Sequence, residues 1–255
     1  MADPTLAVVV LGAGRGSRLR PLTDILPKPL CPVGNRALLD WAVERVGHLG
    51  DVAVNVHHGR AAMEDHLRRL RAHRGVHVSI EEDEALGTAG AVGKLRDWLD
   101  GRAVVVANSD AWGVTQASVD RLLAGWNGSS VRVLVAPQEG HEDFPGVVGR
   151  FAGVSVMPWA AAAALAPVPS GLYEAVWSRT GVEVVETDEP FFDCGTPAEY
   201  LAANLAWSGG ESVVGDGAVV EGELVRSVVW PGGVVARGER LVECIRVGRD
   251  VTVPG

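Results

Sequence analysis

The chain has 255 residues, of which 47% are hydrophobic, and its formal net charge is −9 from 23 basic and 32 acidic residues. This size allows one large domain, or one domain with an appendage, around a full hydrophobic core. The acidic balance argues against a nucleic-acid partner, because nucleic-acid surfaces depend on many Lys and Arg contacts with phosphates. No apolar run reaches 18 residues and no basic segment opens the chain, so we expect a cytoplasmic protein without a membrane span or signal peptide.

A glycine-rich loop follows the first predicted strand. The apolar run 6–10 leads into residues 11–30, which read LGAGRGSRLRPLTDILPKPL and contain three glycines in the first six positions. Glycine lets backbone N–H groups approach an anion that a Cβ would exclude. Arg18 follows the loop, and Lys28, one of only two lysines in the chain, lies between two prolines that stiffen the returning chain. Two cations beside a glycine loop at a strand end are suited to binding a polyphosphate.

Two common phosphate-binding patterns do not fit this loop. A P-loop requires Lys followed by Ser or Thr directly after its last glycine, where this chain has Ser17 and Arg18. A dinucleotide fingerprint that begins at Gly12 requires its third glycine at position 17, where this chain has Ser17, and an acidic residue about 20 residues later. On local grounds, a glycine turn followed by a solvated basic loop remains an alternative.

Helical and strand-like segments alternate after the loop. The predicted helices are 37–49, with Asn35 as its N-cap, 60–71 and 89–99. The predicted strands are 51–56, 76–81, 103–107 and 131–136. The alternation predicts an α/β fold, in which a Rossmann-like, mostly parallel sheet is covered by helices on both faces. Ligands of such sheets bind at the carboxyl ends of the strands.

Two short segments at predicted strand ends are candidate ligand sites. Ala85–Gly90 has small residues that would admit a flat ring against the backbone, although Thr88 could equally cap a helix there. Asp110 follows a buried strand, where a carboxylate can reach a Mg²⁺ that also carries waters and phosphate oxygens. The alternative is that Asp110 is a turn or helix-cap residue.

The positions of the histidines and cysteines do not indicate a metal site. His57 and His58 are adjacent, so their side chains point differently, and no further ligand stands at a suitable spacing, which favours structural roles. The three cysteines are an odd number without CxxC spacing, which predicts reduced thiols that serve in packing.

The second half of the chain contains one sharp motif. Residues 141–158 are predicted to form two short strands around Gly149 and Gly153. A strand then leads to FFDCGTP at 191–197, where Thr196 is a predicted N-cap with proline in the first turn. Asp193 in this motif is either a turn residue or a second carboxylate of a metal site.

The last 44 residues, Ser212 to Gly255, are valine-rich pieces separated by glycine. Val214 and Val220 are six positions apart, as are Val228 and Val234, which is the hexapeptide period of a parallel β-helix. About two irregular coils cannot stand alone, so this tail is expected to pack on the preceding domain or on a second subunit, giving a homodimer. We therefore expect a catalytic domain at 1–208 and a short left-handed β-helix-like tail at 212–255.

Taken together, the motifs resemble the sugar-1-phosphate nucleotidyltransferases. The resemblance rests on residues 11–30, on LGTAG at 86–90, on NSD at 108–110 and on FFDCGTP, and it includes the mannose-1-phosphate guanylyltransferase and N-acetylmuramate-1-phosphate uridylyltransferase branches. It implies catalytic roles for Arg18 and Lys28 and a Mg²⁺ held by Asp110 and Asp193. It implies sugar-phosphate binding near Gly153. The residues implied in nucleotide binding are Leu11, Gly12, Ala13, Gly14, Arg15, Gly16, Ser17, Gly87, Thr88 and Ala89.

The resemblance implies Mg²⁺-dependent transfer of a nucleoside monophosphate from an NTP to a sugar 1-phosphate. The chain lacks the Glu-Lys-Pro stretch whose lysine contacts the sugar phosphate in many members. Arg150 is the candidate replacement and Arg179 is the second, because a guanidinium can bind phosphate with two hydrogen bonds. The alternatives are a non-catalytic nucleotide-sugar-binding regulatory subunit on the same fold, which would not need the whole metal set, and a structural assembly protein built on the tail.

Overall fold

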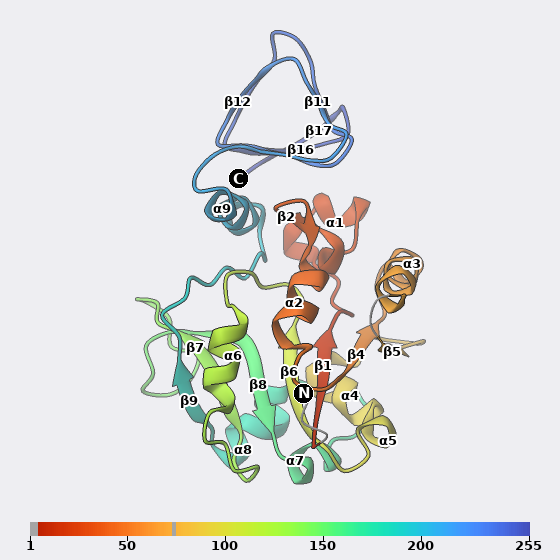
Figure 1. Cartoon of the computed structure of the whole chain (residues 1–255), viewed down its shortest axis with the longest axis vertical. Helices are drawn as coiled ribbons and strands as arrows, with labels where there is room; N and C mark the ends of the chain where they lie inside the picture. The colour runs from red at the N-terminus through yellow and green to blue at the C-terminus, as the bar shows by residue number, and fades with distance from the viewer. Residues whose placement is uncertain (1–4, 73–74) are drawn as a thin grey trace. The chain divides into compact units, whose positions relative to one another are not determined.

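A computed structural model describes residues 5–72 and 75–255. The chain divides into two compact units, and each is discontinuous in sequence. The first unit combines Met1–Gly14 with Ala42–Phe191, and the second combines Arg15–Trp41 with Phe192–Gly255. Figure 1 labels many of their helices and strands. None of the helices within the described ranges is long and apolar enough to cross a membrane.

A seven-stranded sheet forms the first unit, in the order β5-β4-β1-β6-β8-β7-β9 (Figure 1). Its strands are β1 (Leu6–Leu11), β4 (Asp51–Val56), β5 (Val76–Ile80), β6 (Ala103–Asn108), β7 (Arg132–Ala136), β8 (Arg150–Met157) and β9 (Glu183–Glu186). Strand β8 runs antiparallel to β6 and β7, whereas the other neighbouring pairs are parallel. The predicted mostly parallel, Rossmann-like sheet is therefore confirmed.

Helices pack on this sheet because its central strands are apolar on both faces. They are α2 (Leu38–Val46), which begins in the second unit, α3 (Arg60–Arg71), α4 (Gly87–Lys94), α5 (Arg96–Leu99), α6 (Gln116–Leu123), α7 (Trp159–Ala163), the π-helix η3 (Tyr173–Trp177) and α8 (Ser178–Thr180). Ala7 and Val9 of β1 share a buried cluster with Ala89 and Val92 of α4. The intervening Val8 and Val10 are also fully buried, as expected for a strand covered on both sides.

Three local predictions were wrong. Asn35 does not cap a helix: with Gly34 it forms the turn between β2 (Pro32–Val33) and β3 (Arg36–Ala37), and both turn residues have positive φ, of 64° and 59°. Two-residue hairpins favour such conformations, so the Gly-Asn pair makes a hairpin turn. The helix predicted over 89–99 is broken at Leu95 into α4 and α5. Residues 141–158 contain one strand of the sheet, β8 at Arg150–Met157, in place of two short strands, and Gly153, at φ 76°, lies within a bulge of β8 rather than at a strand end.

Short helices and one long helix make up much of the second unit. They are the 3₁₀ helix η1 (Ser17–Leu19), α1 (Leu22–Ile25), the 3₁₀ helix η2 (Lys28–Leu30) and α9 (Pro197–Trp207). Helix α9 begins as predicted: the Thr196 hydroxyl accepts a hydrogen bond from the Glu199 N–H at 3.3 Å, and Pro197 occupies the first turn.

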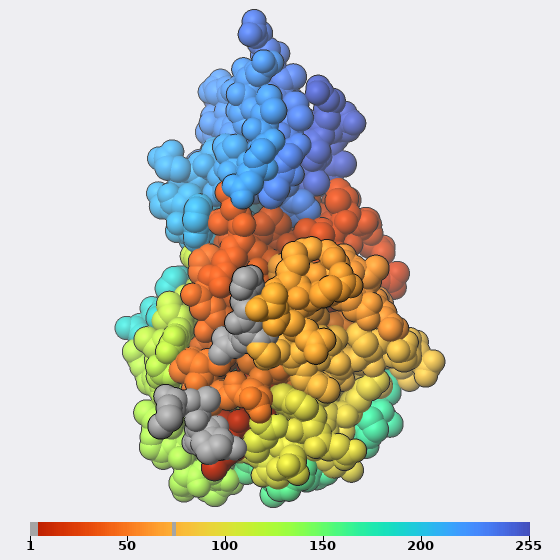
Figure 2. Space-filling model, turned by 45° about the vertical axis from the view of Figure 1, so that its right-hand side comes forward, coloured from red at the N-terminus to blue at the C-terminus, as the bar shows by residue number. Residues whose placement is uncertain are grey.

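The C-terminal strands stack in parallel rows. They are β10 (Val213–Val214), β11 (Val219–Val220), β12 (Glu223–Val225), β13 (Val228–Val229), β14 (Val234–Val235), β15 (Arg240–Val242), β16 (Cys244–Val247) and β17 (Val251–Pro254). The parallel rows are β10-β13-β16, β11-β14 and β12-β15, and β17 pairs antiparallel with β16. Trp230 packs against Tyr200 of α9 with ring centroids 6.3 Å apart. This tail is blue in Figure 2. Its exposed hydrophobic residues include Val214, Val219 and Val242, which are 44–53% exposed.

Candidate functional site

The glycine loop after β1 is shaped by a close contact and an open position. The Gly12 N–H donates a 2.8 Å hydrogen bond to the Asn55 Oδ1, and a Cβ on Gly12 would lie 3.0 Å from the Asn55 carbonyl oxygen. Gly12 therefore lets β1 and β4 approach closely. Gly14 is exposed, and a Cβ there would meet no atom within 4 Å. The backbone at Gly14 is accessible to a ligand.

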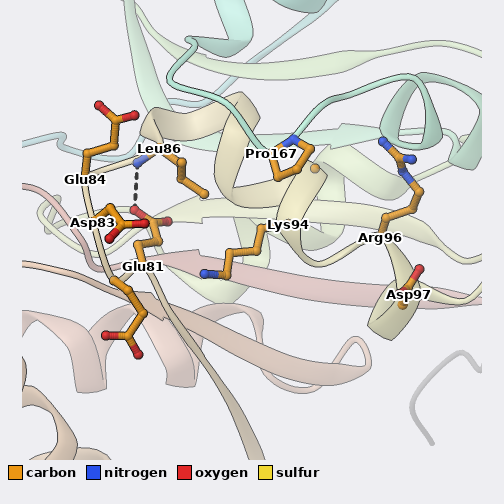
Figure 3. Close-up of a pocket in the computed structure, with 10 residues that line it drawn as sticks. Glu81, Asp83, Glu84, Leu86, Lys94, Arg96, Asp97 and Pro167 are labelled. Carbon is orange, nitrogen blue, oxygen red and sulfur yellow. Dashed lines mark hydrogen bonds between the residues drawn. The ribbon is translucent and has the colours of Figure 1, made fainter.

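A buried polar network joins this loop to the segment before α4. Asn55 and Glu81 are each 2% exposed, and the Asn55 side-chain amide donates to Glu81 Oε1 at 2.7 Å. The other Glu81 carboxylate oxygen accepts from the Leu86 N–H at 2.8 Å (Figure 3). The Glu81 carbonyl is bonded to His57 Nδ1 at 2.7 Å, which gives His57 a structural contact. Neither Asn55 nor Glu81 was predicted from the sequence, although Asn55 is a polar residue inside the apolar run DVAVNV, and a buried polar residue needs a hydrogen-bonding partner.

Residues 87–89, expected at the nucleobase, pack closely against a later segment of the chain. Gly87 has a φ of 69°, and a Cβ there would lie 2.6 Å from the Ser170 carbonyl oxygen. The Ala89 N–H donates to that same oxygen at 3.0 Å, and the Thr88 hydroxyl accepts from the Leu172 N–H at 2.8 Å. Thr88 therefore secures the 168–172 segment rather than capping α4. The small residues here allow this packing.

A cavity of about 630 Å³ adjoins Leu86 and is lined mainly by charged residues. Figure 3 shows Glu81, Asp83 and Glu84 on one side and Lys94 on α4. The Lys94 ammonium donates to the Ile80 carbonyl. The acidic lining makes this cavity unsuitable for a polyphosphate.

The Asp110 loop is fastened to β1 and α2. Ser109, which is 1% exposed, bonds the Leu11 carbonyl through its hydroxyl and through its N–H. Arg45 of α2 donates to the carbonyls of Asn108, at 2.8 Å, and Ala111, at 3.4 Å. Burial lowers the pKa of the Arg45 guanidinium to about 10, and the nearby Asp110 carboxylate opposes that shift. Asp110 is thus held at the carboxyl end of β6, as the sequence predicted.

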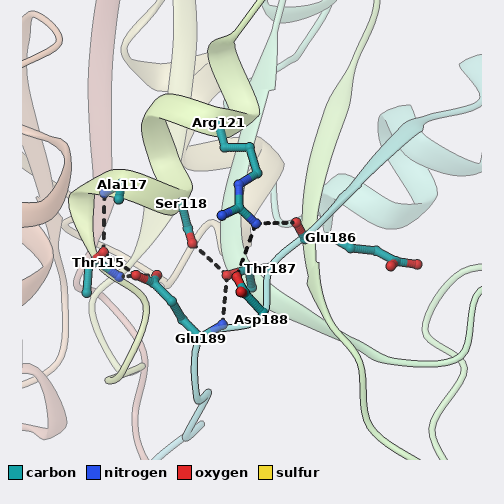
Figure 4. Close-up of polar contacts among 8 residues, drawn as sticks. All are labelled: Thr115, Ala117, Ser118, Arg121, Glu186, Thr187, Asp188 and Glu189. Atoms are coloured by element: carbon teal, nitrogen blue, oxygen red, sulfur yellow. Dashed lines mark hydrogen bonds and ion pairs between the residues drawn. The ribbon is translucent and has the colours of Figure 1, made fainter.

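The segment that leads into the FFDCGTP motif is anchored beside the same loop. The Glu189 carboxylate accepts from the Thr115 N–H at 2.8 Å and from its hydroxyl, and the Ser118 and Thr187 hydroxyls are bonded to each other (Figure 4). A Cβ on Gly113 would lie 2.1 Å from the Pro190 carbonyl oxygen. Only glycine therefore fits where residues 187–190 pass the Asp110 loop.

The two residues expected at the sugar phosphate lie on β8. A Cβ on Gly153 would contact the Cβ atoms of Asn108 and Ala111 at 3.4 Å, so this bulge is adjacent to the Asp110 loop. The Arg150 guanidinium lies over the Phe191 ring, 5.7 Å from its centroid. Arg179, the second candidate, instead lines a cavity of about 770 Å³ beside Val131, Pro158 and Glu183. Pro158, which lines that cavity, follows Met157, and Met157 pairs with Val104 at the start of β6. The cavity is therefore at the opposite end of the strands from Asp110.

In the second unit, Arg18 and Lys28 converge on Asp193. The Arg18 Nη2 lies 3.5 Å from the Asp193 Oδ2, and the Lys28 ammonium donates to the Asp193 carbonyl at 3.4 Å. Lys28 is only 6% exposed, whereas the Arg18 side chain is 69% exposed. A Cβ on Gly195 would lie within 3.0–3.1 Å of the Arg18 guanidinium and of the Asp193 and Glu199 carboxylates. The glycine of the FFDCGTP motif therefore leaves room for these charges.

Gly16 closes the loop that carries the two cations. It is left-handed, with a φ of 65°, and its carbonyl accepts a 2.9 Å hydrogen bond from the Thr23 hydroxyl. A Cβ on Gly16 would lie 2.9 Å from both the Lys28 Cβ and the Thr23 Cγ2. The loop therefore packs directly on the stem of Lys28.

The donor set is suited to a hard divalent cation. Residues 5–72 and 75–255 contain no group of three or more His, Cys, Asp or Glu that could hold a metal by themselves. Mg²⁺ is usually bound by one or two carboxylates, with waters and substrate phosphates completing its shell. Asp110 and Asp193 are each a carboxylate of the kind that binds Mg²⁺.

Comparison with known proteins decides the family. A family model described as a MobA-like NTP transferase domain matches residues 8–243. The chain belongs to this family. This MobA-like NTP transferase is 34% identical over 135 residues to N-acetylmuramate alpha-1-phosphate uridylyltransferase of Caulobacter vibrioides, a match that covers 50% of this chain and 55% of the relative. It is 37% identical over 108 residues to mannose-1-phosphate guanyltransferase of Debaryomyces hansenii, covering 40% and 30%. The matches thus span about half or less of these curated relatives.

Solved structures share the fold of this MobA-like NTP transferase. A Thermus thermophilus protein described as a mannose-1-phosphate geranyltransferase superposes with a TM-score of 0.71 at 20% identity, covering 98% of this chain and 94% of that one. A UTP-bound UGPase from Acinetobacter baumannii superposes with a TM-score of 0.65 at 17% identity, covering 81% and 93%. At these identities the likeness concerns the fold alone.

Proposed function

We propose that this MobA-like NTP transferase is a Mg²⁺-dependent sugar-1-phosphate nucleotidyltransferase. The observation that carries the proposal is the convergence of Arg18 and Lys28 on Asp193, three residues that the family resemblance assigns to one reaction. Relatives named for uridylyl and guanyl transfer to sugar 1-phosphates support the same reaction class. The proposal places the reaction in the cytoplasm.

In the proposed reaction, a sugar 1-phosphate oxygen attacks the α-phosphorus of an NTP in line. A new P–O bond forms, the bond to the bridging oxygen of the β-phosphate breaks, and pyrophosphate leaves with that electron pair. The attacking oxygen is already anionic, so the reaction depends on positioning and charge neutralisation more than on a general base.

The chain's own residues divide this work. Residues 11–17 would hold the nucleotide, with the open backbone at Gly14 facing phosphate and the exposed Arg18 binding the β- and γ-phosphates. Lys28 would neutralise the α-phosphate as charge builds there. Residues 87–89 would line the nucleobase, and Gly153 with Arg150 would receive the sugar phosphate.

Asp110 and Asp193 are the residues proposed to hold Mg²⁺. When bound, the ion would neutralise phosphate charge and orient the reacting oxygens. Ser109 and Arg45 hold the Asp110 loop, and the room above Gly195 accommodates the Asp193 carboxylate.

We also propose that residues 1–208 are the catalytic domain and that 212–255 form a short left-handed β-helix-like tail. The parallel rows of β10-β13-β16, β11-β14 and β12-β15 support the tail. Its exposed valines support a homodimer contact.

A pyrophosphate-release assay over UTP, GTP, CTP, ATP and dTTP tests the function, with N-acetylmuramate, mannose and glucose 1-phosphates as acceptors. We expect one nucleotide and acceptor pair to turn over only with Mg²⁺, and either Asp110→Asn or Asp193→Asn to abolish turnover while the protein stays folded. Tight nucleotide-sugar binding with no pyrophosphate release from any pair would instead identify a regulatory subunit. An Asn variant with near-normal activity in limiting Mg²⁺ would refute the metal assignment.

A further inference from the structure

Arg45 is a buried cation behind the loop that carries Asp110. It is 4% exposed and reaches this loop from α2, far away in sequence. Its Nη2 donates to the Asn108 carbonyl at 2.8 Å and its Nη1 to the Ala111 carbonyl at 3.4 Å. The two acceptors flank Asp110 along the chain, so one guanidinium spans the base of the loop.

A buried cation is costly unless polar partners surround it. Arg45 is stabilised by the two carbonyls and by favourable electrostatic interaction with the Asp110 carboxylate. A guanidinium presents its donors in a rigid planar fork, whereas the lysine ammonium is a compact point charge on a flexible stem. Arginine can therefore hold the two carbonyls at a set separation more rigidly than lysine could.

The loop has a second anchor on its other side. Both the N–H and the hydroxyl of Ser109 are bonded to the Leu11 carbonyl at the end of β1. With Arg45 holding the carbonyls of Asn108 and Ala111, residues 108–111 are fixed from the sheet and from α2. The backbone on both sides of Asp110 is thus held in place, which fixes the position from which its side chain projects.

We propose that Arg45 is a positioning residue that holds Asp110 in the orientation required to bind the divalent metal. The inference rests on the metal role of Asp110 in the proposed function. Arg45 does not touch substrate in this proposal, and its planar fork, more than its charge, is the feature that the site uses. Replacements of groups that orient a metal ligand typically reduce metal affinity by roughly 10- to 100-fold.

Arg45→Lys keeps the charge and loses the fork, and Arg45→Met removes both. Mn²⁺ binding is measured by the loss of the free-ion electron paramagnetic resonance signal, with full-length protein and a triphosphate that has a non-cleavable α,β bridge. We expect both variants to bind Mn²⁺ about 10-fold more weakly. At saturating metal, the triphosphate KM is expected to stay within about 2-fold of the wild-type value, a separation that general loosening of the fold would not produce.

Arg102→Lys is the matched control. Arg102 also donates to two carbonyls, those of Leu99 and Trp98, but it precedes β6 at the end opposite Asp110. This variant is expected to keep wild-type Mn²⁺ affinity. If Arg45→Met fails to fold, Arg45→Lys alone decides the outcome.

Wild-type Mn²⁺ affinity in a folded Arg45→Lys would overturn the inference, as would an equal loss in Arg102→Lys. Asp110→Asn separates this inference from the function on which it rests. If Asp110→Asn also binds Mn²⁺ normally, the metal role of Asp110 in the proposed function fails. If Asp110→Asn loses Mn²⁺ while Arg45→Lys keeps it, the proposed function stands and only the role of Arg45 is wrong.

Discussion

Replacing Lys28 with methionine is expected to slow turnover by roughly 10²- to 10³-fold with little change in the triphosphate KM. Lys28 is 6% exposed, so its ammonium acts where solvent screening is weak. Opposite unit charges at about 4 Å and an effective dielectric constant of about 20 interact by about 4 kcal/mol, which sets an upper limit. The Lys28 ammonium is used mainly in the transition state, as the α-phosphate becomes more negative. Its loss should therefore remove about 3 to 4 kcal/mol of transition-state stabilisation.

Methionine keeps the apolar stem of Lys28, which packs under Gly16. The substitution removes the hydrogen bond from the Lys28 ammonium to the Asp193 carbonyl, which should cost about 1.5 to 3 kcal/mol and lower the melting temperature by several degrees. Steady-state pyrophosphate release with each substrate varied in turn gives kcat and KM. Lys94→Met, at the exposed second lysine, is the control and is expected to retain wild-type kcat. Normal turnover of Lys28→Met with only a raised triphosphate KM would refute this role.

Three further predictions concern the acceptor, the thiols and the tail. Arg150→Ala is expected to raise the sugar-phosphate KM well above any change in the triphosphate KM; equal effects on both would return Arg150 to a surface role. Burial raises the pKa of the Cys31 thiol from its ordinary 9.0 to about 12, so its stabilising effect is complete below pH 9 and is lost as pH rises towards 12. From pH 8 to pH 10, urea titrations should show the wild type losing ~1.4 kcal/mol relative to Cys31→Ala, and parallel pH profiles would contradict this. Deleting 212–255 should lower the melting temperature, because Tyr200 and Leu201 of α9 would lose their cover; unchanged melting and elution volume would rule out that contact.

Much of the fold was predictable because the spacing of apolar residues, which indicates helices and buried strands, can be seen locally in the sequence. The runs at 6–10 and 103–107 are apolar throughout, which favours buried strands, and they form most of β1 and β6. The hairpin at Asn35 was missed because Asn is favoured both at helix caps and in turns, and only the pairing of β2 with β3 distinguishes the two.

The candidate site likewise contains residues that sequence motifs could identify and one that they could not. Arg18, Lys28 and Asp193 belong to contiguous motifs, and the structure brings all three together. Arg45 belongs to no motif, and its hydrogen-bond acceptors are 63 and 66 positions away. Nothing in the local sequence could identify such a supporting residue, because its role depends on how α2 packs behind β6.

The discontinuity of the second unit has a consequence for biosynthesis. Arg18 and Asp193 are 175 positions apart, and Lys28 and Asp193 are 165 apart. The cationic loop is therefore translated early, whereas the carboxylate that it contacts emerges late. Contacts between such distant segments form slowly, because a long loop must close first. A nascent chain that stops before residue 192 would carry the glycine loop without Asp193, so a truncated translation product cannot complete this half of the site.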